Sequence, residues 1–135
     1  MGLSVTIPQL KEEIPHGVHE CIIDNVYALK DANGDLITYL ASPCVVFSFN
    51  CNGNIFEKAF RIGDQFEYKT FKKLLAILGV LKKDIAFSRN DVIGKKVCIF
   101  IQKIINRETG EYTMKIVNYK PAGKNYTYIT SEIYV

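Results

Sequence analysis

The sequence has no tryptophan, no long apolar run and no recognisable targeting segment. A helix needs about 20 apolar residues to cross a membrane, and the apolar runs of this chain are all much shorter. The first fifteen residues lack the basic start and the apolar centre of a signal peptide. We therefore expect a cytoplasmic protein that does not contact a membrane.

Signatures of catalysis and of metal binding are also missing. The chain contains no phosphate-binding loop, no serine-hydrolase elbow and no cysteine-histidine signature. His16 and His19 are three residues apart at the start of a predicted strand, and no cysteine or carboxylate completes a zinc motif around them. We expect no enzymatic activity, no metal and no cofactor.

The four cysteines, Cys21, Cys44, Cys51 and Cys98, form no C-x-x-C pair. Three of them lie inside apolar runs that are typical of strands. An even number of cysteines in a small secreted domain would favour disulfides. In a cytoplasmic domain of 135 residues we expect buried free thiols instead.

Charge is distributed unequally along the chain. Residues 1–67 carry four Lys/Arg and nine Asp/Glu, a balance of −5, whereas residues 68–135 carry thirteen and five, a balance of +8. A basic excess of this kind indicates a cationic surface that faces a polyanion, most often a nucleic acid. Solvated faces without a partner are the alternative interpretation.

Turn residues divide the chain into short elements. The pattern predicts β-rich stretches at 18–29, 36–51 and 55–62, separated by turns at Asn33-Gly34 and Asn52-Gly53. Pro43 in the second stretch indicates an edge position or a bulge. A helix is predicted from 65 to 78, with Asp64 as its cap and Gly79 at its end. Two further strands, 95–105 and 112–120, follow.

Three strands, a helix and two strands is the element order of the OB-fold barrel. We predict a mainly β fold with one helix: a five-stranded antiparallel OB-fold barrel over 14–121, with a less closed α+β sheet as the alternative. Residues 1–13 form an N-terminal arm. Residues 122–135 form a tail whose alternating Tyr126, Tyr128, Ile133 and Tyr134 indicate an added strand or a self-association element.

Aromatic and basic residues alternate on the last predicted hairpin. Aligning its strands across the 107–110 turn places Ile99 and Ile101 beside Asn118 and Ile116 on an interior face. The opposite face then carries the residues expected to stack bases and to contact phosphates, which are Lys96, Phe100, Lys115 and Tyr119. Packing of the two rings under the helix or the tail is the alternative.

The hairpin before the helix offers a second candidate surface. A two-residue turn at Asn52-Gly53 places Phe47, Lys58 and Phe60 on one face and Arg61 on the other. We expect the aromatic face to be core, with Lys58 reaching the rim and Arg61 on the outer surface. If the aromatic face is exposed, it is a binding surface instead.

Three segments resemble a family of small phage and prophage proteins: Pro15–His19, Val92–Val97 and the ending Asn118–Pro121. The family is regarded as OB-fold single-stranded-DNA-binding proteins of replication or recombination, and the resemblance covers roughly residues 14–121. The resemblance implies a bacterial host cell and single-stranded DNA as a partner, together with recombinase or replication proteins. The tail has only one acidic residue, Glu132, which departs from the acidic tails that recruit replication proteins.

The functional expectation is sequence-nonspecific binding of single-stranded DNA in phage replication or recombination. The alternative is a β-barrel for protein interaction or assembly that does not bind nucleic acid, with a tail that pairs with a neighbour's edge strand and gives a homo-oligomer.

Overall fold

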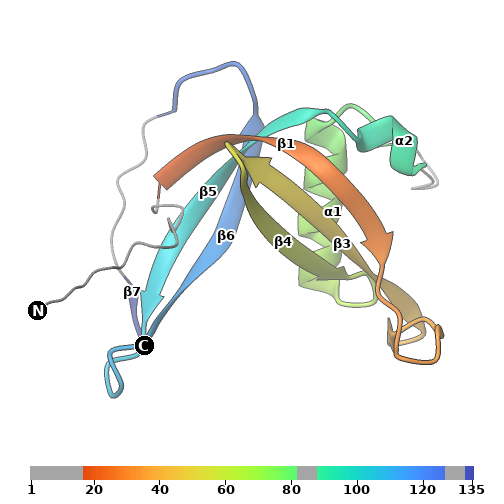
Figure 1. Cartoon of the computed structure of the whole chain (residues 1–135), viewed down its shortest axis with the longest axis horizontal. Coiled ribbons are helices and arrows are strands. Elements are labelled where there is room, and N and C mark those ends of the chain that lie inside the picture. Colours follow the sequence, from red (N-terminus) through yellow and green to blue (C-terminus); the bar gives the residue numbers. More distant parts are fainter. Residues whose placement is uncertain (1–16, 82–87, 127–132) are drawn as a thin grey trace, which may run out of the picture.

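Strands dominate the computed structural model, which describes residues 17–81, 88–126 and 133–135 (Figure 1). The predicted arm at 1–13 and His16 lie outside the described residues. The elements are β1 (Gly17–Ala28), β2 (Thr38–Tyr39), β3 (Ser42–Cys51), β4 (Asn54–Arg61), α1 (Gln65–Ile77), α2 (Arg89–Val92), β5 (Lys96–Ile105), β6 (Tyr112–Pro121) and β7 (Ile133–Tyr134).

The strands form one mixed sheet that does not close. They pair in the order β2-β3-β1-β5-β6, with β4 on β3 and β7 on β5. Every pair is antiparallel except β5 with β7. Within the described ranges β4 and β6 do not pair, so the predicted closed five-stranded antiparallel barrel is not confirmed. A mainly β fold with one main helix is confirmed.

The turn at Asn52-Gly53 sets the register of the hairpin β3–β4. Both residues have positive φ, 54° and 92°, as a two-residue hairpin turn requires. Cys51 therefore pairs with Asn54, and Phe47 lies opposite Lys58. This confirms the expected register.

One stretch that was predicted as a single strand, 36–51, is divided in the structure. The chain reverses at Leu40-Ala41, and β2 pairs back onto the start of β3, with Thr38 opposite Pro43. The short β2 places Pro43 at the margin of the sheet, where a missing N–H donor is tolerated.

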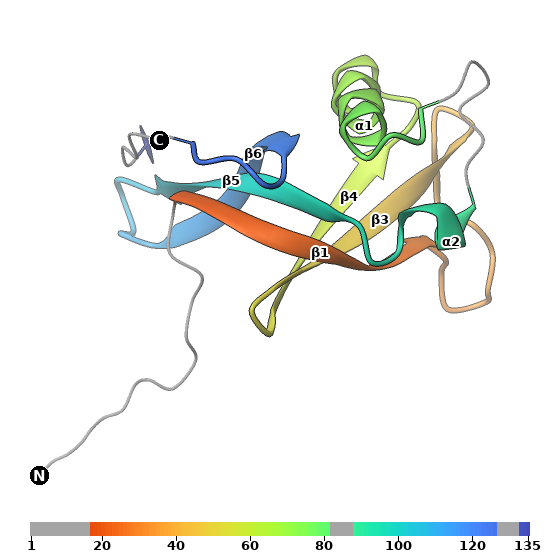
Figure 2. The same ribbon diagram turned by 90° about the horizontal axis from the view of Figure 1, so that it is seen from above.

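Helix α1 begins and ends where its capping residues predict. The Asp64 carboxylate accepts hydrogen bonds from the backbone N–H groups of Phe66 and Glu67, both at 3.0 Å, and Gly79 (φ 76°) ends the helix. Its apolar stripe is buried: Phe71, Leu74, Leu75 and Leu78. The helix covers one face of the sheet (Figure 2) and joins the hydrophobic core there.

The expectation of four free thiols is wrong for one pair. Cys21 on β1 and Cys51 on β3 are joined by a disulfide, with their Cα atoms 4.5 Å apart. The two strands pair from Ile22 with Asn50 onward, so the cysteines continue that ladder. Cys44 and Cys98 are buried free thiols, as predicted.

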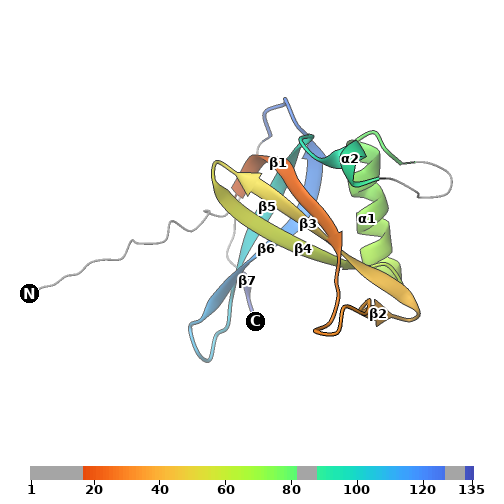
Figure 3. The ribbon, with the colours of Figure 1, turned by 45° about the vertical axis from the view of Figure 1, so that its right-hand side comes forward.

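Two residues of the tail form β7 on the chain's own β5. Ile133 pairs with Ile104 and Tyr134 pairs with Ile105, in parallel. Seen from the side, this strand lies at the far end of the β5–β6 hairpin, away from β2 and α1 (Figure 3). None of the described helices is long and apolar enough to span a bilayer.

Candidate nucleic-acid interface

The predicted outward position of Tyr119 is wrong because β6 contains a bulge. Phe100 pairs with Asn118 but Ile101 pairs with Ile116, so Val117 is an extra residue on β6. The extra residue reverses the side-chain alternation beyond it. Tyr119 therefore pairs with Ile99 on the interior face, is 1% exposed, and cannot stack a base in this structure.

Phe100 keeps the predicted outer face but is not accessible there. Its ring is covered by Tyr126, with the ring centroids 5.8 Å apart at a steep angle. The Tyr126 hydroxyl donates to the Pro121 carbonyl at 2.6 Å, which holds the start of the tail over the strand. Phe100 is 7% exposed as a result, so the alternative of packing under the tail applies to this ring.

Both predicted lysines are exposed but lie far apart. Lys96 starts β5, next to Ile22 of β1, whereas Lys115 lies opposite Gln102, six residues further along β5. At about 3.3 Å per residue the two positions are roughly 20 Å apart along the strand. The four residues that were expected to share one platform do not form one.

Arg61 lies on the outer face, as predicted, but its guanidinium is already occupied. Its Nε donates to the Glu67 carboxylate, and a terminal nitrogen lies 3.7 Å from Asp64. The guanidinium also lies over the Tyr39 ring, 4.5 Å from the centroid. The hydrogen bond to Glu67 also raises the pKa of Arg61, and the guanidinium is paired with the protein's own acids.

The aromatic face of the β3–β4 hairpin is core, so the rings of Phe47 and Phe60 are not accessible to a ligand in this structure. Both rings are completely buried, 5.9 Å apart, and each contacts Phe71 of α1. Lys58 is half-buried on the same face of the edge strand β4. The aromatic face of the β3–β4 hairpin is therefore the buried one, and it does not offer the alternative binding surface in this structure.

Exposed rings and cations do meet at the far end of the β5–β6 hairpin. Lys103 Nζ lies 4.3 Å from the centroid of the Tyr112 ring, and the Arg107 guanidinium lies 5.9 Å from that of Tyr134. Lys115 is exposed on the other face of β6, opposite Gln102, and it lines a surface pocket together with Tyr112 at this end of the hairpin. These five residues, Lys103, Arg107, Tyr112, Lys115 and Tyr134, are called the arm site below.

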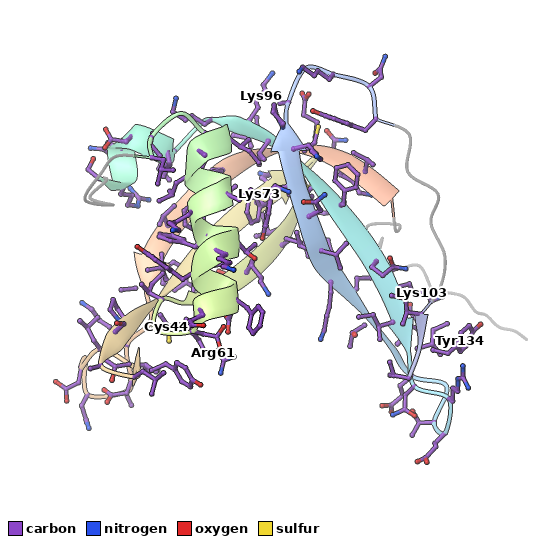
Figure 4. All side chains as sticks on the ribbon, turned by 180° about the vertical axis from the view of Figure 1, so that it is seen from behind. Cys44, Arg61, Lys73, Lys96, Lys103 and Tyr134 are labelled. Carbon is purple, nitrogen blue, oxygen red and sulfur yellow. A yellow bond between two sulfur atoms is a disulfide. The ribbon has the colours of Figure 1, made fainter. Side chains whose placement is uncertain are left out.

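Basic residues continue from the arm site along the same half of the molecule. Figure 4 shows Lys103 and Tyr134 toward one end of the β5–β6 hairpin, Lys96 at the other end, and Lys73 on α1. Lys73 donates to the Asn118 side chain across the gap between α1 and β6. Two acidic residues, Glu108 and Glu111, lie in the arm's turn. Residues 95–121 carry six Lys/Arg and two Glu, a balance of +4, so half of the basic excess of the second half lies on this hairpin.

Strands β1 and β4 present a more acidic surface than the β5–β6 hairpin does. Glu57 on β4 accepts hydrogen bonds from the Tyr27 hydroxyl at 2.8 Å and from the Ser48 hydroxyl at 3.0 Å. The hydrogen bond to Glu57 raises the pKa of Tyr27. Asp24 is exposed on the neighbouring β1. Of the exposed tyrosines, only those on the arm have a cation over the ring among the described contacts.

Sequence reasoning missed Tyr112 and Tyr134 as site residues. Tyr112 shares the inward-facing side of β6 with Met114 and Ile116, but the hairpin extends beyond the core there and leaves the ring 41% exposed. Tyr134 reaches the arm only through the pairing of β7 with β5. The alternation of aromatic residues in the tail was the only indication of that pairing.

Comparison with known proteins adds no family to this geometry. The sequence matches no protein-family model and no curated protein.

Proposed function

We propose that this chain binds single-stranded DNA without marked sequence preference, through the arm site. The observation that carries the proposal is the placement of two exposed tyrosine rings, each under a cation, at the end of the β5–β6 hairpin, where Lys115 is exposed on the other face of β6. Single-strand binders stack bases on such rings and hold phosphates with neighbouring basic side chains.

We infer that the strands follow the strand order of the OB-fold, with the last pair of the barrel, β4 with β6, not formed in the described residues. The pairs β1–β3, β3–β4, β1–β5 and β5–β6 correspond to four of the barrel's strand contacts, and α1 lies between the third and fourth long strands. In OB-folds the loop that joins the last two strands takes part in binding oligonucleotides. The arm site lies at that loop, which supports the functional proposal.

The biological role that we propose is protection of single strands in phage replication or recombination, without enzymatic activity, in the cytoplasm of a bacterial host. Recombinase or replication proteins are the proposed partners. The Cys21–Cys51 disulfide would be reduced in that compartment. The proposal therefore requires that the dithiol form also folds and binds.

Removing the Tyr112 ring should weaken binding to oligo-dT. For Tyr112→Ala we expect a loss of roughly 1–3 kcal/mol if one base stacks on the ring. The matched control is Tyr27→Ala, because Tyr27 is 38% exposed, close to the 41% of Tyr112, but lies on the acidic surface. Fluorescence anisotropy with labelled oligo-dT measures the affinity of each variant. Equal affinities of the two variants would remove the arm site from the proposal.

Binding should also depend on salt. With about three to five phosphates neutralised, log affinity should fall against log salt with a slope of roughly −2 to −3.5. Lys115→Ala should reduce the magnitude of the slope by about 0.7, since one phosphate contact is lost. Lys30→Ala, a lysine removed in the acidic half, should leave the slope unchanged. A chain that fails to bind oligo-dT at low salt is not a single-strand binder.

A further inference from the structure

The bulge at Val117 changes which basic residues of β6 share a face. Lys115 pairs with Gln102 on the outer face of the β5–β6 hairpin. Lys120 pairs with Cys98, which lies on that outer face as well. Without the extra residue, positions 115 and 120 would lie on opposite faces, because side chains alternate along a strand. The bulge therefore brings Lys120 onto the face of Lys115.

Lys96 extends this row of lysines to the start of β5. It lies two residues before Cys98 on the same face, and it is exposed next to Ile22 of β1. Within the part of the chain that the structure describes, no hydrogen bond or ion pair engages the ammonium groups of Lys96, Lys115 and Lys120. Three cations thus follow one face of the hairpin, and the first and last positions are about 20 Å apart at about 3.3 Å per residue.

An aromatic ring lies between these lysines. Tyr126 of the tail rests on Phe100, with the ring centroids 5.8 Å apart. Phe100 lies two residues from each of the positions opposite Lys115 and Lys120, which is about 7 Å along the strand in either direction. Phe100 is buried, whereas Tyr126 remains partly exposed above it. The outer face therefore presents the Tyr126 ring to solvent, with a cation on either side of it.

The Tyr126 ring is held in place by the protein itself. Its hydroxyl donates to the Pro121 carbonyl at 2.6 Å, which closes residues 121–126 into a short loop. The backbone N–H of Gly123 donates to the Glu20 carboxylate at 3.1 Å and joins this loop to β1. A side chain that is already ordered loses little conformational freedom when a ligand binds to it.

The outer face has a positive net charge after its acidic neighbours are counted. Its described charged residues are one acid and four lysines: Glu20, Lys96, Lys115, Lys120 and Lys124. The neighbouring Lys95 and Asp24 cancel one another. The two cations and the two acids at the tip of the hairpin also cancel: Lys103, Arg107, Glu108 and Glu111. The balance is therefore +3, which attracts a phosphate backbone.

We propose that a single strand bound at the arm site continues along this face, where Tyr126 stacks a base and Lys115, Lys120 and Lys96 contact phosphates. These four residues are called the outer track below. Steps of about 7 Å between positions on the face are close to the phosphate spacing of an extended strand. The inference rests on the proposed function and gives the site a length. From Lys115 to Lys96 the track accommodates about six nucleotides at the stacked spacing of about 3.4 Å per phosphate, and fewer in an extended strand.

Two substitutions of Tyr126 separate base stacking from anchoring of the tail. Tyr126→Phe and Tyr126→Leu both lose the hydrogen bond to Pro121, and both keep an apolar side chain on Phe100. The phenylalanine alone keeps a ring on which a base can stack. For oligo-dT of about 15 nucleotides we expect Tyr126→Phe to bind within about twofold of the wild type and Tyr126→Leu to lose at least about fivefold in affinity. Fluorescence anisotropy at low salt measures both affinities. Equal affinities of the two variants contradict stacking on Tyr126.

Removal of Lys120 tests the phosphate contacts of the outer track. Lys120→Ala should reduce the magnitude of the salt slope by about 0.7, since one phosphate contact is lost. The matched control is Lys69→Ala, because Lys69 is an exposed lysine of α1 outside the outer track, and this variant should keep the slope of the wild type. A Lys120→Ala variant with the full slope shows that the strand does not pass Lys120.

Comparison with Tyr112→Ala separates this inference from the proposed function. If Tyr112→Ala weakens binding while Tyr126→Leu binds as Tyr126→Phe does, the arm site binds alone and the outer track is wrong. If Tyr126→Leu weakens binding and Tyr112→Ala does not, the outer track holds the strand without the arm site. A wild type that does not bind oligo-dT at low salt overturns both proposals.

Discussion

Replacing Tyr119 by alanine should destabilise the fold by about 3–5 kcal/mol, the range for removing a large buried ring. The ring is among the largest fully buried side chains, and it packs 5.8 Å from Phe49 and 6.3 Å from Phe60. The Tyr119 ring therefore packs β6 against β4, two strands that are not joined by backbone hydrogen bonds in the described residues. Urea unfolding followed by circular dichroism measures the change. If the alanine variant unfolds at the same urea concentration as the wild type, Tyr119 is not in the core.

Tyr119→Phe is the matched control, because it keeps the ring and removes only the hydroxyl. That hydroxyl is buried and has no hydrogen-bond partner among the described residues. A buried polar group without a partner costs roughly 1–3 kcal/mol. The phenylalanine variant should therefore be as stable as the wild type or more stable by about 1 kcal/mol. A marked loss would mean that the hydroxyl has a partner in solution.

The same hydroxyl predicts a loss of stability at alkaline pH. Burial raises the pKa of Tyr119 well above its ordinary value, so the folded protein keeps the proton at a pH where the unfolded chain releases it. The unfolded state then binds fewer protons, and the free energy of unfolding falls as pH rises above about 10. The wild type should lose about 1.4 kcal/mol per pH unit more than Tyr119→Phe in that range. Parallel pH profiles for the two proteins would contradict the burial of the phenol.

Much of the fold could be predicted because local chemistry determines it. Asp64 and Gly79 bound a helix with an apolar stripe, and Asn52-Gly53 fixes the register of the adjoining hairpin. The Leu40-Ala41 turn was missed because neither residue favours positive φ. Its conformation depends on the contact with Gly63, which a local pattern does not reveal.

The candidate site was predicted less well because it depends on a single extra residue. The sequence of β6 is compatible with either register, because apolar side chains occur at its odd-numbered and at its even-numbered positions, Val117 and Tyr119 among the former. The bulge moved Tyr119 inward, and the tail covered Phe100 through Tyr126. The exposed position of Lys115 was predicted correctly, because Lys115 lies between the turn and the bulge, where the predicted register holds. Contacts that the tail makes with β5 then completed the arm site.

The disulfide was missed for a related reason. Cys21 and Cys51 become neighbours only through the pairing of β1 with β3, and β1 carries its own register shift between Ile23 and Asn25. No local spacing of cysteines indicates a partner 30 residues away across a sheet. The compartment argument then favoured free thiols, which is correct for Cys44 and Cys98 alone.

Reducing this disulfide should lower the free energy of unfolding by about 3–4 kcal/mol, since a loop of this length limits the entropy of the unfolded chain. The sequence separation of 30 residues sets that magnitude. For a domain of this size the melting temperature should fall by roughly 10 °C in the presence of a reductant. The double variant Cys21→Ala/Cys51→Ala should melt near the temperature of the reduced wild type and should not respond to the reductant. A control variant, Cys44→Ala, removes a free thiol and should keep the full response to the reductant. If the wild type melts at one temperature in both conditions, the two sulfur atoms are not bonded in solution, and the β1–β3 ladder is held by its hydrogen bonds and its apolar side chains alone.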